Sequence, residues 1–239
     1  MIAPFFNEPP TRDTSALNDT ENDNAVPAAV TIDPATIPFV ERSARAFDAT
    51  RLGDGLAFLR GFLARPLEVA SVVPSSPFLE ARVVRAADLG PARCVVELGP
   101  GTGGTTRALL RAMTPQARLL AVELNPDFCM RLRRRIADPR LAVQGGSAEA
   151  LIAHLQRWGL PPADVVVSGL PFSTLPVEVA RRIAAAIDAG LAPGGRVVAY
   201  QVRAHVAGYI APRLGRPRTA WEWRNVPPMR VFRWINPAA

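Results

Sequence analysis

The sequence has no lysine, few cysteines and no long apolar run. All 28 basic residues are arginines, and the only thiols are Cys94 and Cys129, without metal-ligand spacing. This scarcity argues against a disulfide framework and a cysteine-based metal site, so we expect no metal and a reducing, cytoplasmic location. No 18 apolar residues stand together, and the start MIAPFFNEPPTRD lacks a basic, apolar leader. We therefore expect neither a membrane-spanning helix nor secretion.

Negative charge is concentrated at the N-terminus. Residues 1–40 carry six acids against one arginine, a net charge of −5, while the whole chain carries +7, so the remaining residues carry +12. This excess of positive charge after residue 40 favours an anionic partner, either nucleic acid or an acidic membrane leaflet. Residues 1–36 lack hydrophobic periodicity and are predicted to be a disordered acidic tail outside the fold.

Residues 37–90 are predicted to be a helical segment that precedes the main domain. Within it, apolar side chains recur at helical spacing. Two interpretations fit, a helix packed on the core or an amphipathic helix that lies in the membrane interface. The residues that would face the core or the membrane are Leu52, Leu56, Phe58, Leu59, Phe62 and Leu63.

Residues 91–239 alternate between strand-like and helix-like patterns. Apolar strands separated by helices predict an α/β fold, with a seven-stranded, mostly parallel sheet and helices on both faces. The expected strands are 94–98, 119–124, 141–144, 164–168, 196–202, 219–225 and 229–235, and the expected helices are 104–113, 126–137, 147–158 and 177–190.

A glycine-rich loop after the first strand indicates a nucleotide-type cofactor, because glycines let the backbone approach a ligand closely. Gly99, Gly101 and Gly104 of this loop also satisfy the dinucleotide-binding pattern G-x-G-x-x-G. Glu97 beside the loop would repel a pyrophosphate but complement the cationic end of S-adenosylmethionine, and Glu123 can accept both ribose hydroxyls. We therefore favour S-adenosylmethionine over a nicotinamide. The expected cofactor residues are Glu97, Gly99, Pro100, Gly101, Thr102, Gly103, Glu123, Leu124, Gly146, Ser147, Ala148 and Ser168.

Ser147 follows the third strand and has two compatible interpretations. Its hydroxyl can read the adenine, or it can cap the helix that begins at Ala148.

Three stretches together resemble the soluble bacterial phospholipid N-methyltransferases: VELGPGTGGTT, FLRGFLARPLEVASVVPSSPFLEARVV and SGLPFSTLP. The resemblance runs from about residue 50 to the C-terminus. It implies a Rossmann-like class I methyltransferase that converts phosphatidylethanolamine toward phosphatidylcholine and releases S-adenosylhomocysteine. It also implies attachment to the inner face of the cytoplasmic membrane through the amphipathic helix, with anionic lipids rather than nucleic acid as partners. On this ground the membrane interpretation of residues 52–63 is favoured.

The strand end Ser168-Gly169-Leu170-Pro171-Phe172 is expected to hold the acceptor amine. The related ribosomal RNA adenine dimethylases have Asn-Leu-Pro-Tyr at this place, where the asparagine amide and the aromatic ring hold the base. Here Gly169 offers only backbone, which suits a primary amine. Carbonyls would aim the nitrogen, and an aromatic face would stabilise the new cation. The expected catalytic residues are Ser168, Gly169, Leu170, Pro171, Phe172 and Tyr200.

Several alternatives stay open. They are an RNA adenine or small-amine methyltransferase, and a non-catalytic lipid-binding module that keeps a relic cofactor fold. The candidates for receiving the amine's proton are Tyr200, Tyr209, His205 and Glu149. For the lipid headgroup we expect Ser75, Ser76 and Arg203. The arginines at 131–135, and those that alternate with tryptophans near the C-terminus, fit a solvated face, an anionic lipid surface or nucleic acid.

Overall fold

The computed structural model describes residues 75–237. The predicted acidic tail, the predicted helix at 52–63 and Pro74 lie outside the described residues. Five strands follow one another with helices between them: β1 (Cys94–Leu98), β2 (Arg118–Glu123), β3 (Leu141–Gly145), β4 (Ala163–Ser168) and β5 (Leu191–Gln201). Strands β1, β2 and β4 are rich in valine and leucine and almost entirely buried, as expected for strands covered on both faces.

The seven strands form one sheet in the order β3-β2-β1-β4-β5-β7-β6. Strands β1 to β5 are parallel, while β7 (Met229–Ile235) runs antiparallel to β5 and β6 (Arg218–Glu222) antiparallel to β7. The predicted mostly parallel, seven-stranded sheet is therefore confirmed. Because β1 to β5 are parallel, their carboxyl ends meet at one edge of the sheet.

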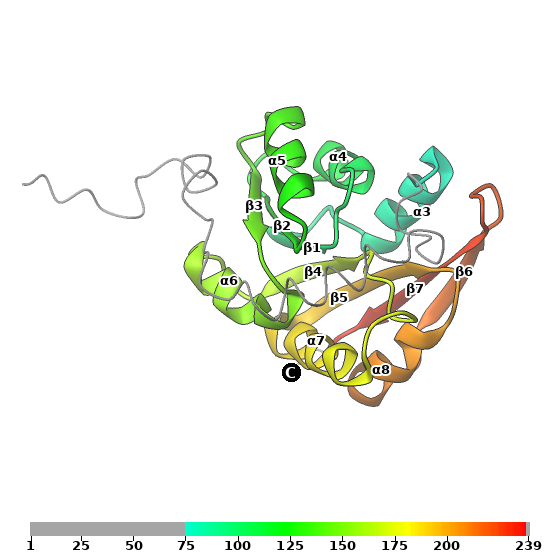
Figure 1. The fold of residues 1–239 in the computed structure, drawn as a ribbon. Helices are drawn as coiled ribbons and strands as arrows, with labels where there is room; N and C mark the ends of the chain where they lie inside the picture. The colour runs from blue at the N-terminus through cyan, green and yellow to red at the C-terminus, as the bar shows by residue number, and fades with distance from the viewer. Residues whose placement is uncertain (1–74, 238–239) are drawn as a thin grey trace, which may run out of the picture.

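Helices cover both faces of the sheet (Figure 1). One layer holds α3 (Pro77–Ala87), α4 (Gly104–Ala112) and α5 (Pro126–Arg135). The other holds α6 (Leu151–Arg157), α7 (Val177–Gly190) and α8 (His205–Leu214), after a short 3-10 turn, Ala148–Ala150. Side chains alternate along β1, so Val95 faces the first layer and Val96 the second.

The sequence patterns missed α8 and shortened β5. Gly208 and Pro212 interrupt the helical pattern of α8, which nevertheless buries Val206 and Ile210 against the sheet. Strand β5 begins at Leu191, which pairs with Ala163 across an irregularity in the register. Both thiols are buried and free, and burial raises the pKa of each to about 12.

No helix of the described residues is long and apolar enough to cross a membrane.

Candidate active site

The glycine loop leaves the carboxyl end of β1 and turns directly into α4. Gly99, Gly101 and Gly103 have φ values of 72°, 53° and 83°, a left-handed backbone that favours glycine. A side chain at Gly103 would come within 2.6 Å of Leu132, while one at Gly101 would meet nothing within 4 Å. The loop is therefore packed against the protein on one side and open at Gly101, where a ligand can lie against the backbone.

Glu97 is fully buried beneath this loop, and neither of its carboxylate oxygens has a hydrogen-bond partner in the described part of the chain. Its pKa is raised to about 8, mainly by burial, and the nearby carboxylates of Glu123 and Glu80 act in the same direction. The Thr106 hydroxyl lowers the pKa, although it does not have the geometry of a hydrogen bond. An unpartnered buried acid suits a cationic ligand, whose charge would stabilise the carboxylate.

Glu123 ends β2 and holds the glycine loop. Its Oε2 accepts a hydrogen bond from the Gly101 backbone N–H at 3.0 Å, and its Oε1 accepts one from the Asn125 N–H at 2.9 Å. Burial raises the pKa of this carboxyl, and the backbone donors act against the shift. The carboxylate thus lies beside the open glycine, as binding of a ribose would require.

The third strand end is braced by a histidine. The His154 ring contacts the Ser147 carbonyl at 3.0 Å, and burial lowers its pKa, which favours the neutral ring. The Ser147 hydroxyl accepts from the Glu149 N–H at 3.2 Å, so the predicted N-cap is confirmed. The Gly146 N–H donates to the Glu123 carbonyl at 3.0 Å. This loop therefore lies next to the β2 end, and adenine recognition by Ser147 stays a prediction.

The remaining expected cofactor residues fall on the same edge. Pro100 is buried, Thr102 is partly exposed in the glycine loop, Leu124 is partly buried after β2, and Ala148 is buried at the start of the 3-10 turn.

The acceptor loop lies against the glycine loop. The Gly169 N–H donates to the Leu98 carbonyl at 2.9 Å, and a side chain at Gly169 would come within 3.1 Å of the Gly99 carbonyl and 2.5 Å of the Tyr200 hydroxyl. Only glycine fits this position. Leu170 packs over Gly99, so the two loops share one wall.

Gln201 holds the acceptor loop from the end of β5. Its buried amide Nε2 donates to the Leu170 carbonyl at 2.7 Å. The Leu170 N–H in turn approaches the buried Ser168 hydroxyl at 3.4 Å, and the Phe172 N–H donates to the Leu170 carbonyl at 3.0 Å. These contacts fix a loop that presents mainly backbone groups.

The two aromatic rings near the loop, which are expected to stabilise the new cation, are both buried. Phe172 is 1% exposed and packs in the core, with its ring 5.8 Å from that of Tyr209. Tyr200 is buried, and its hydroxyl lies 3.3 Å from that of Thr105. Burial, reinforced by Glu97, raises the pKa of Tyr200 well above its ordinary value, so the group stays a phenol. A role for Phe172 at the loop surface stays a prediction.

Two residues that contact the loops of the candidate site were missed by the sequence patterns. Glu80 of α3 reaches the first residue of α4, where a side chain on Gly104 would collide with its carboxylate. Burial raises the Glu80 pKa, while Arg111 and Arg107 lower it. Gln201 could have been noticed, because a polar residue ends an otherwise apolar strand. Glu80 carries no such signal, since its place depends on how α3 packs.

The expected headgroup residues are scattered along this edge. Ser76 caps α3 by accepting from the Leu79 N–H at 3.2 Å, and its own N–H donates to Asn225 Oδ1 at 2.9 Å. Ser75 is partly buried, and its hydroxyl is among the groups that lower the Tyr200 pKa. Arg203 is exposed just beyond β5. The membrane-facing residues from Leu52 to Leu63 lie outside the described residues.

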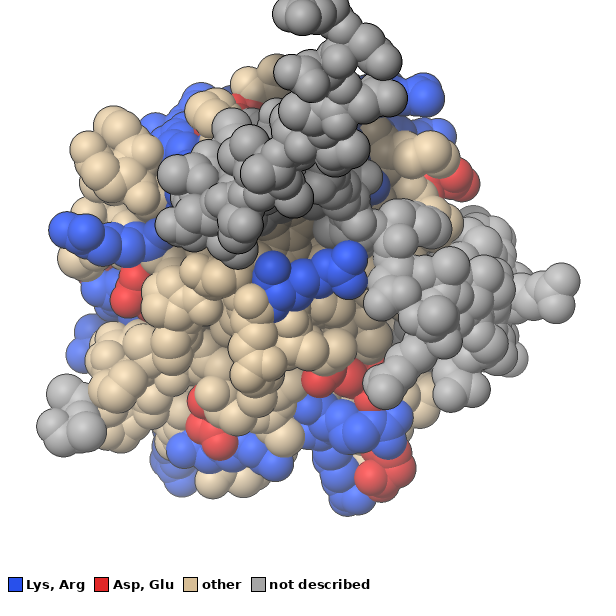
Figure 2. Space-filling model, turned by 90° about the vertical axis from the view of Figure 1, so that its left-hand side faces the viewer, with Lys and Arg blue, Asp and Glu red and all other residues tan. Residues whose placement is uncertain are grey.

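The arginines of α5 are mostly solvated. Arg131, Arg134 and Arg135 are exposed, whereas Arg133 donates to the Val143 carbonyl at 2.7 Å. Figure 2 shows the molecule from the side on which β3 and α6 lie in Figure 1, and its basic side chains are spread out and interspersed with acidic ones. Where described residues are visible in this view, the distribution fits the solvated interpretation better than one continuous basic patch.

The site fits S-adenosylmethionine. Glu123 can accept the ribose hydroxyls, Gly101 leaves space for close approach, and the buried Glu97 carboxyl, without a hydrogen-bond partner among the described residues, could be stabilised by a cation. Among residues 75–237 no cluster of acidic, histidine or cysteine side chains could hold a metal ion.

Comparison with known proteins agrees with this geometry. A family model described as a methyltransferase domain matches residues 95–195. An ornithine lipid N-methyltransferase from Singulisphaera acidiphila is 38% identical over 143 residues, which are 59% of this chain and 74% of that protein. A ribosomal RNA small subunit methyltransferase A from Parasynechococcus marenigrum is 35% identical over 135 residues, 56% of this chain. This chain covers 43% of that protein.

Solved structures share the fold at low identity. A precorrin-6y C5,15-methyltransferase from Geobacter metallireducens has a TM-score of 0.57 at 15% identity, covering 70% of this chain and 92% of that one. The N-methyltransferase NodS from Bradyrhizobium japonicum, in complex with S-adenosylhomocysteine, has a TM-score of 0.54 at 16% identity, covering 83% and 96%. This chain covers 74% of the ornithine lipid N-methyltransferase at 38% identity. It therefore belongs to the class I S-adenosylmethionine-dependent methyltransferases.

Proposed function

We propose that this enzyme methylates the primary amine of a membrane lipid headgroup, with the conversion of phosphatidylethanolamine toward phosphatidylcholine as the expected reaction. The observation that carries the proposal is the contact between the two loops. Gly169 is confined between the Gly99 carbonyl and the Tyr200 hydroxyl, so the acceptor position offers backbone and no amide side chain. A small amine needs only such carbonyl acceptors to aim its lone pair, because orientation supplies most of the acceleration.

S-adenosylmethionine supplies a methyl group made electrophilic by the sulfonium. Around it, the carbonyls near Ser168 and Gly169 would orient the headgroup nitrogen, and the rings of Phe172 and Tyr200 would stabilise the positive charge. Of the proposed proton acceptors, Tyr200 is a phenol at neutral pH, and Glu149 is held by Arg182 and by the Ser147 hydroxyl.

The remaining proton acceptors are Tyr209, which is partly buried, and His205, which is exposed at the start of α8. Either could pass the proton to water.

The named activity of the Singulisphaera relative supports a lipid amine. Ethanolamine and ornithine headgroups both present a primary amine beside an acidic group, a phosphate in one and a carboxylate in the other. Guanidinium groups bind either acid in a bidentate manner, which suits a chain whose only basic side chains, apart from two histidines, are arginines.

Methylation of an RNA adenine is the second candidate, supported by the ribosomal RNA methyltransferase relatives. Against it stands Gly169, where the tight contacts with Tyr200 and Gly99 leave no space for a base-holding side chain.

The test is incubation with methyl-labelled S-adenosylmethionine and, in separate tubes, vesicles of phosphatidylethanolamine, vesicles of ornithine lipid, and ribosomal RNA. We expect label in phosphatidylethanolamine. Label in ornithine lipid alone would keep a lipid amine as the acceptor but replace phosphatidylethanolamine by ornithine lipid as the substrate. Label in RNA alone would refute the proposal. Failure to bind S-adenosylhomocysteine in calorimetry would instead support the non-catalytic lipid-binding module.

A further inference from the structure

The turn between β6 and β7, residues 223–228, lies at the same edge of the sheet as the active site. Gln201, the last residue of β5, pairs with Arg230 near the start of β7, and Glu222 pairs with Met229. The turn therefore extends beyond the carboxyl end of β5, on the same edge of the sheet as the acceptor loop. It is attached to α3 by the Ser76 N–H, which donates to Asn225 Oδ1 at 2.9 Å.

Large apolar side chains are exposed on this turn and on the adjoining start of α3. Trp223 is 68% exposed, Val226 82% and Phe78 47%. Exposed apolar groups that cluster at one edge mark an interaction surface, whereas isolated ones do not. We call these three side chains, together with Arg85 and Arg224, the hairpin surface.

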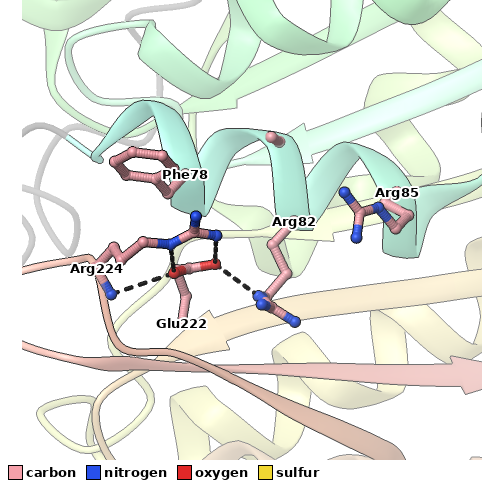
Figure 3. Close-up of a pocket in the computed structure, with 6 residues that line it drawn as sticks. Phe78, Arg82, Arg85, Glu222 and Arg224 are labelled. Carbon is pink, nitrogen blue, oxygen red and sulfur yellow. Dashed lines mark hydrogen bonds and ion pairs between the residues drawn. The ribbon is translucent and has the colours of Figure 1, made fainter.

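Arginines surround the apolar groups. A hollow of about 230 Å³ between α3 and the hairpin is lined by Phe78, Arg82, Arg85 and Arg224, with Glu222 at its base. Figure 3 shows Arg82 and Arg224 both reaching Glu222, at 2.8 and 3.0 Å, while Arg85 points along α3 without an ion pair to the described residues. Three guanidinium groups against one carboxylate leave the hollow with a net charge of +2.

The aromatic groups are held in fixed positions. Trp221 and Trp223 stack with ring centroids 4.8 Å apart, and the Arg230 guanidinium lies 4.3 Å over Trp221. Arg224 lies 4.1 Å over the Phe78 ring. A rigid surface loses little conformational entropy when it binds.

We propose that the hairpin surface docks the enzyme on an anionic lipid leaflet. Tryptophan favours the membrane interface, an aliphatic tip such as Val226 enters the acyl boundary, and arginines attract acidic headgroups. Nucleic acid fits less well, because the Phe78 and Trp221 rings are already covered by arginines, and Val226 offers no stacking face. Docking here turns the carboxyl edge of the sheet, with both loops, toward the leaflet.

Tryptophan fluorescence tests this surface directly. The chain has four tryptophans and none precedes residue 158, so residues 1–74 contribute no signal. Trp158 and Trp234 are buried, which leaves Trp221 and Trp223 open to quenching by bromine-labelled lipids. With full-length protein and phosphatidylglycerol-containing vesicles we expect strong quenching, which Trp221→Phe combined with Trp223→Phe should largely remove, because the two remaining tryptophans are buried.

Sedimentation with vesicles supplies the matched comparison. Arg85→Glu combined with Val226→Asp should weaken binding to anionic vesicles by at least roughly tenfold, because an attraction becomes a repulsion at the surface. The control, Arg134→Glu with Ile152→Asp, makes the same changes at exposed positions on α5 and α6, and should alter binding less than about twofold.

Binding without tryptophan quenching, equal loss in both double variants, or quenching by RNA but not by vesicles would each overturn the inference. It takes from the proposed function only that the enzyme works at a lipid surface, and the two can fail separately. Quenching without any methylated lipid would leave the docking surface and refute the proposed reaction. Methylation of detergent-dispersed lipid without tryptophan quenching by vesicles would support the proposed reaction and refute the docking surface.

Discussion

Replacing Glu97 by glutamine should remove a large part of the pH dependence of stability between pH 5 and 8. In the unfolded chain this carboxyl ionises near its ordinary pKa of 4.5, whereas burial raises the folded pKa to about 8. Unfolding therefore releases a proton in this range, and the free energy of unfolding falls as pH rises. The stability linked to the protonated acid is complete below pH 4.5 and is lost as pH approaches 8.

The magnitude follows from the two pKa values. At 1.36 kcal/mol per pH unit, the interval from 4.5 to about 8 corresponds to about 5 kcal/mol. Glutamine keeps the size of the side chain and a buried polar group but cannot ionise. The difference between the two proteins therefore isolates Glu97 from the other titrating groups, of which Glu123 and Glu80 shift in the same direction.

Urea unfolding of both proteins at pH 5, 6, 7 and 8, followed by circular dichroism, measures this difference. The wild-type free energy of unfolding should fall more steeply with pH than that of the variant. Calorimetry adds a second readout, since a bound cation stabilises the carboxylate, and binding of S-adenosylmethionine at pH 7 should release close to one proton from the wild type. Parallel stability curves and equal proton release would refute the assignment of Glu97.

Three further substitutions test the site. Glu123→Ala should weaken binding of S-adenosylhomocysteine by roughly 10- to 100-fold in calorimetry, because charge-assisted hydrogen bonds are lost, and unchanged affinity would remove this carboxylate from the ribose site. Gln201→Leu removes the side-chain donor to the Leu170 carbonyl and leaves only the Phe172 N–H, at a cost of about 1 kcal/mol, and should lower kcat while sparing cofactor affinity; an equal loss of both would contradict a positioning role. Gly169→Ala should abolish methyl transfer because of its contact with the Tyr200 hydroxyl, and adding Tyr200→Phe should restore some of the activity, whereas an active Gly169→Ala enzyme would show that the acceptor position is roomier than described.

The sheet could be predicted because its strands are continuous apolar runs between turn residues. Strands β1 and β7 and helix α7 begin and end where the sequence patterns place them. Nearly every residue of a buried parallel strand is apolar, so such a strand can be recognised from the local sequence alone. Helix α8 was missed because Gly208 and Pro212 disrupt its pattern, although burial of its apolar side overrides their low helix propensity.

The sequence predicted which backbone loops form the site, but not which side chains contact them. The glycine loop and the Ser168–Phe172 loop follow strands that the sequence defines, and parallel strands bring their carboxyl ends together. The side-chain partners come from distant segments. Glu80 reaches Gly104, and Asn225 meets Ser76 across 149 residues of chain. Such contacts depend on how helices and hairpins pack, which no local pattern records.

The central claim is that the acceptor of the methyl group is a lipid amine. One competition reaction measures it most directly: the full-length enzyme with methyl-labelled S-adenosylmethionine, phosphatidylethanolamine–phosphatidylglycerol vesicles and ribosomal RNA in the same tube, extracted into organic and aqueous fractions. We expect the label in the organic fraction as N-methylated phosphatidylethanolamine, and its loss in the Gly169→Ala variant. Label confined to N6-methyladenine in the aqueous fraction would contradict the account.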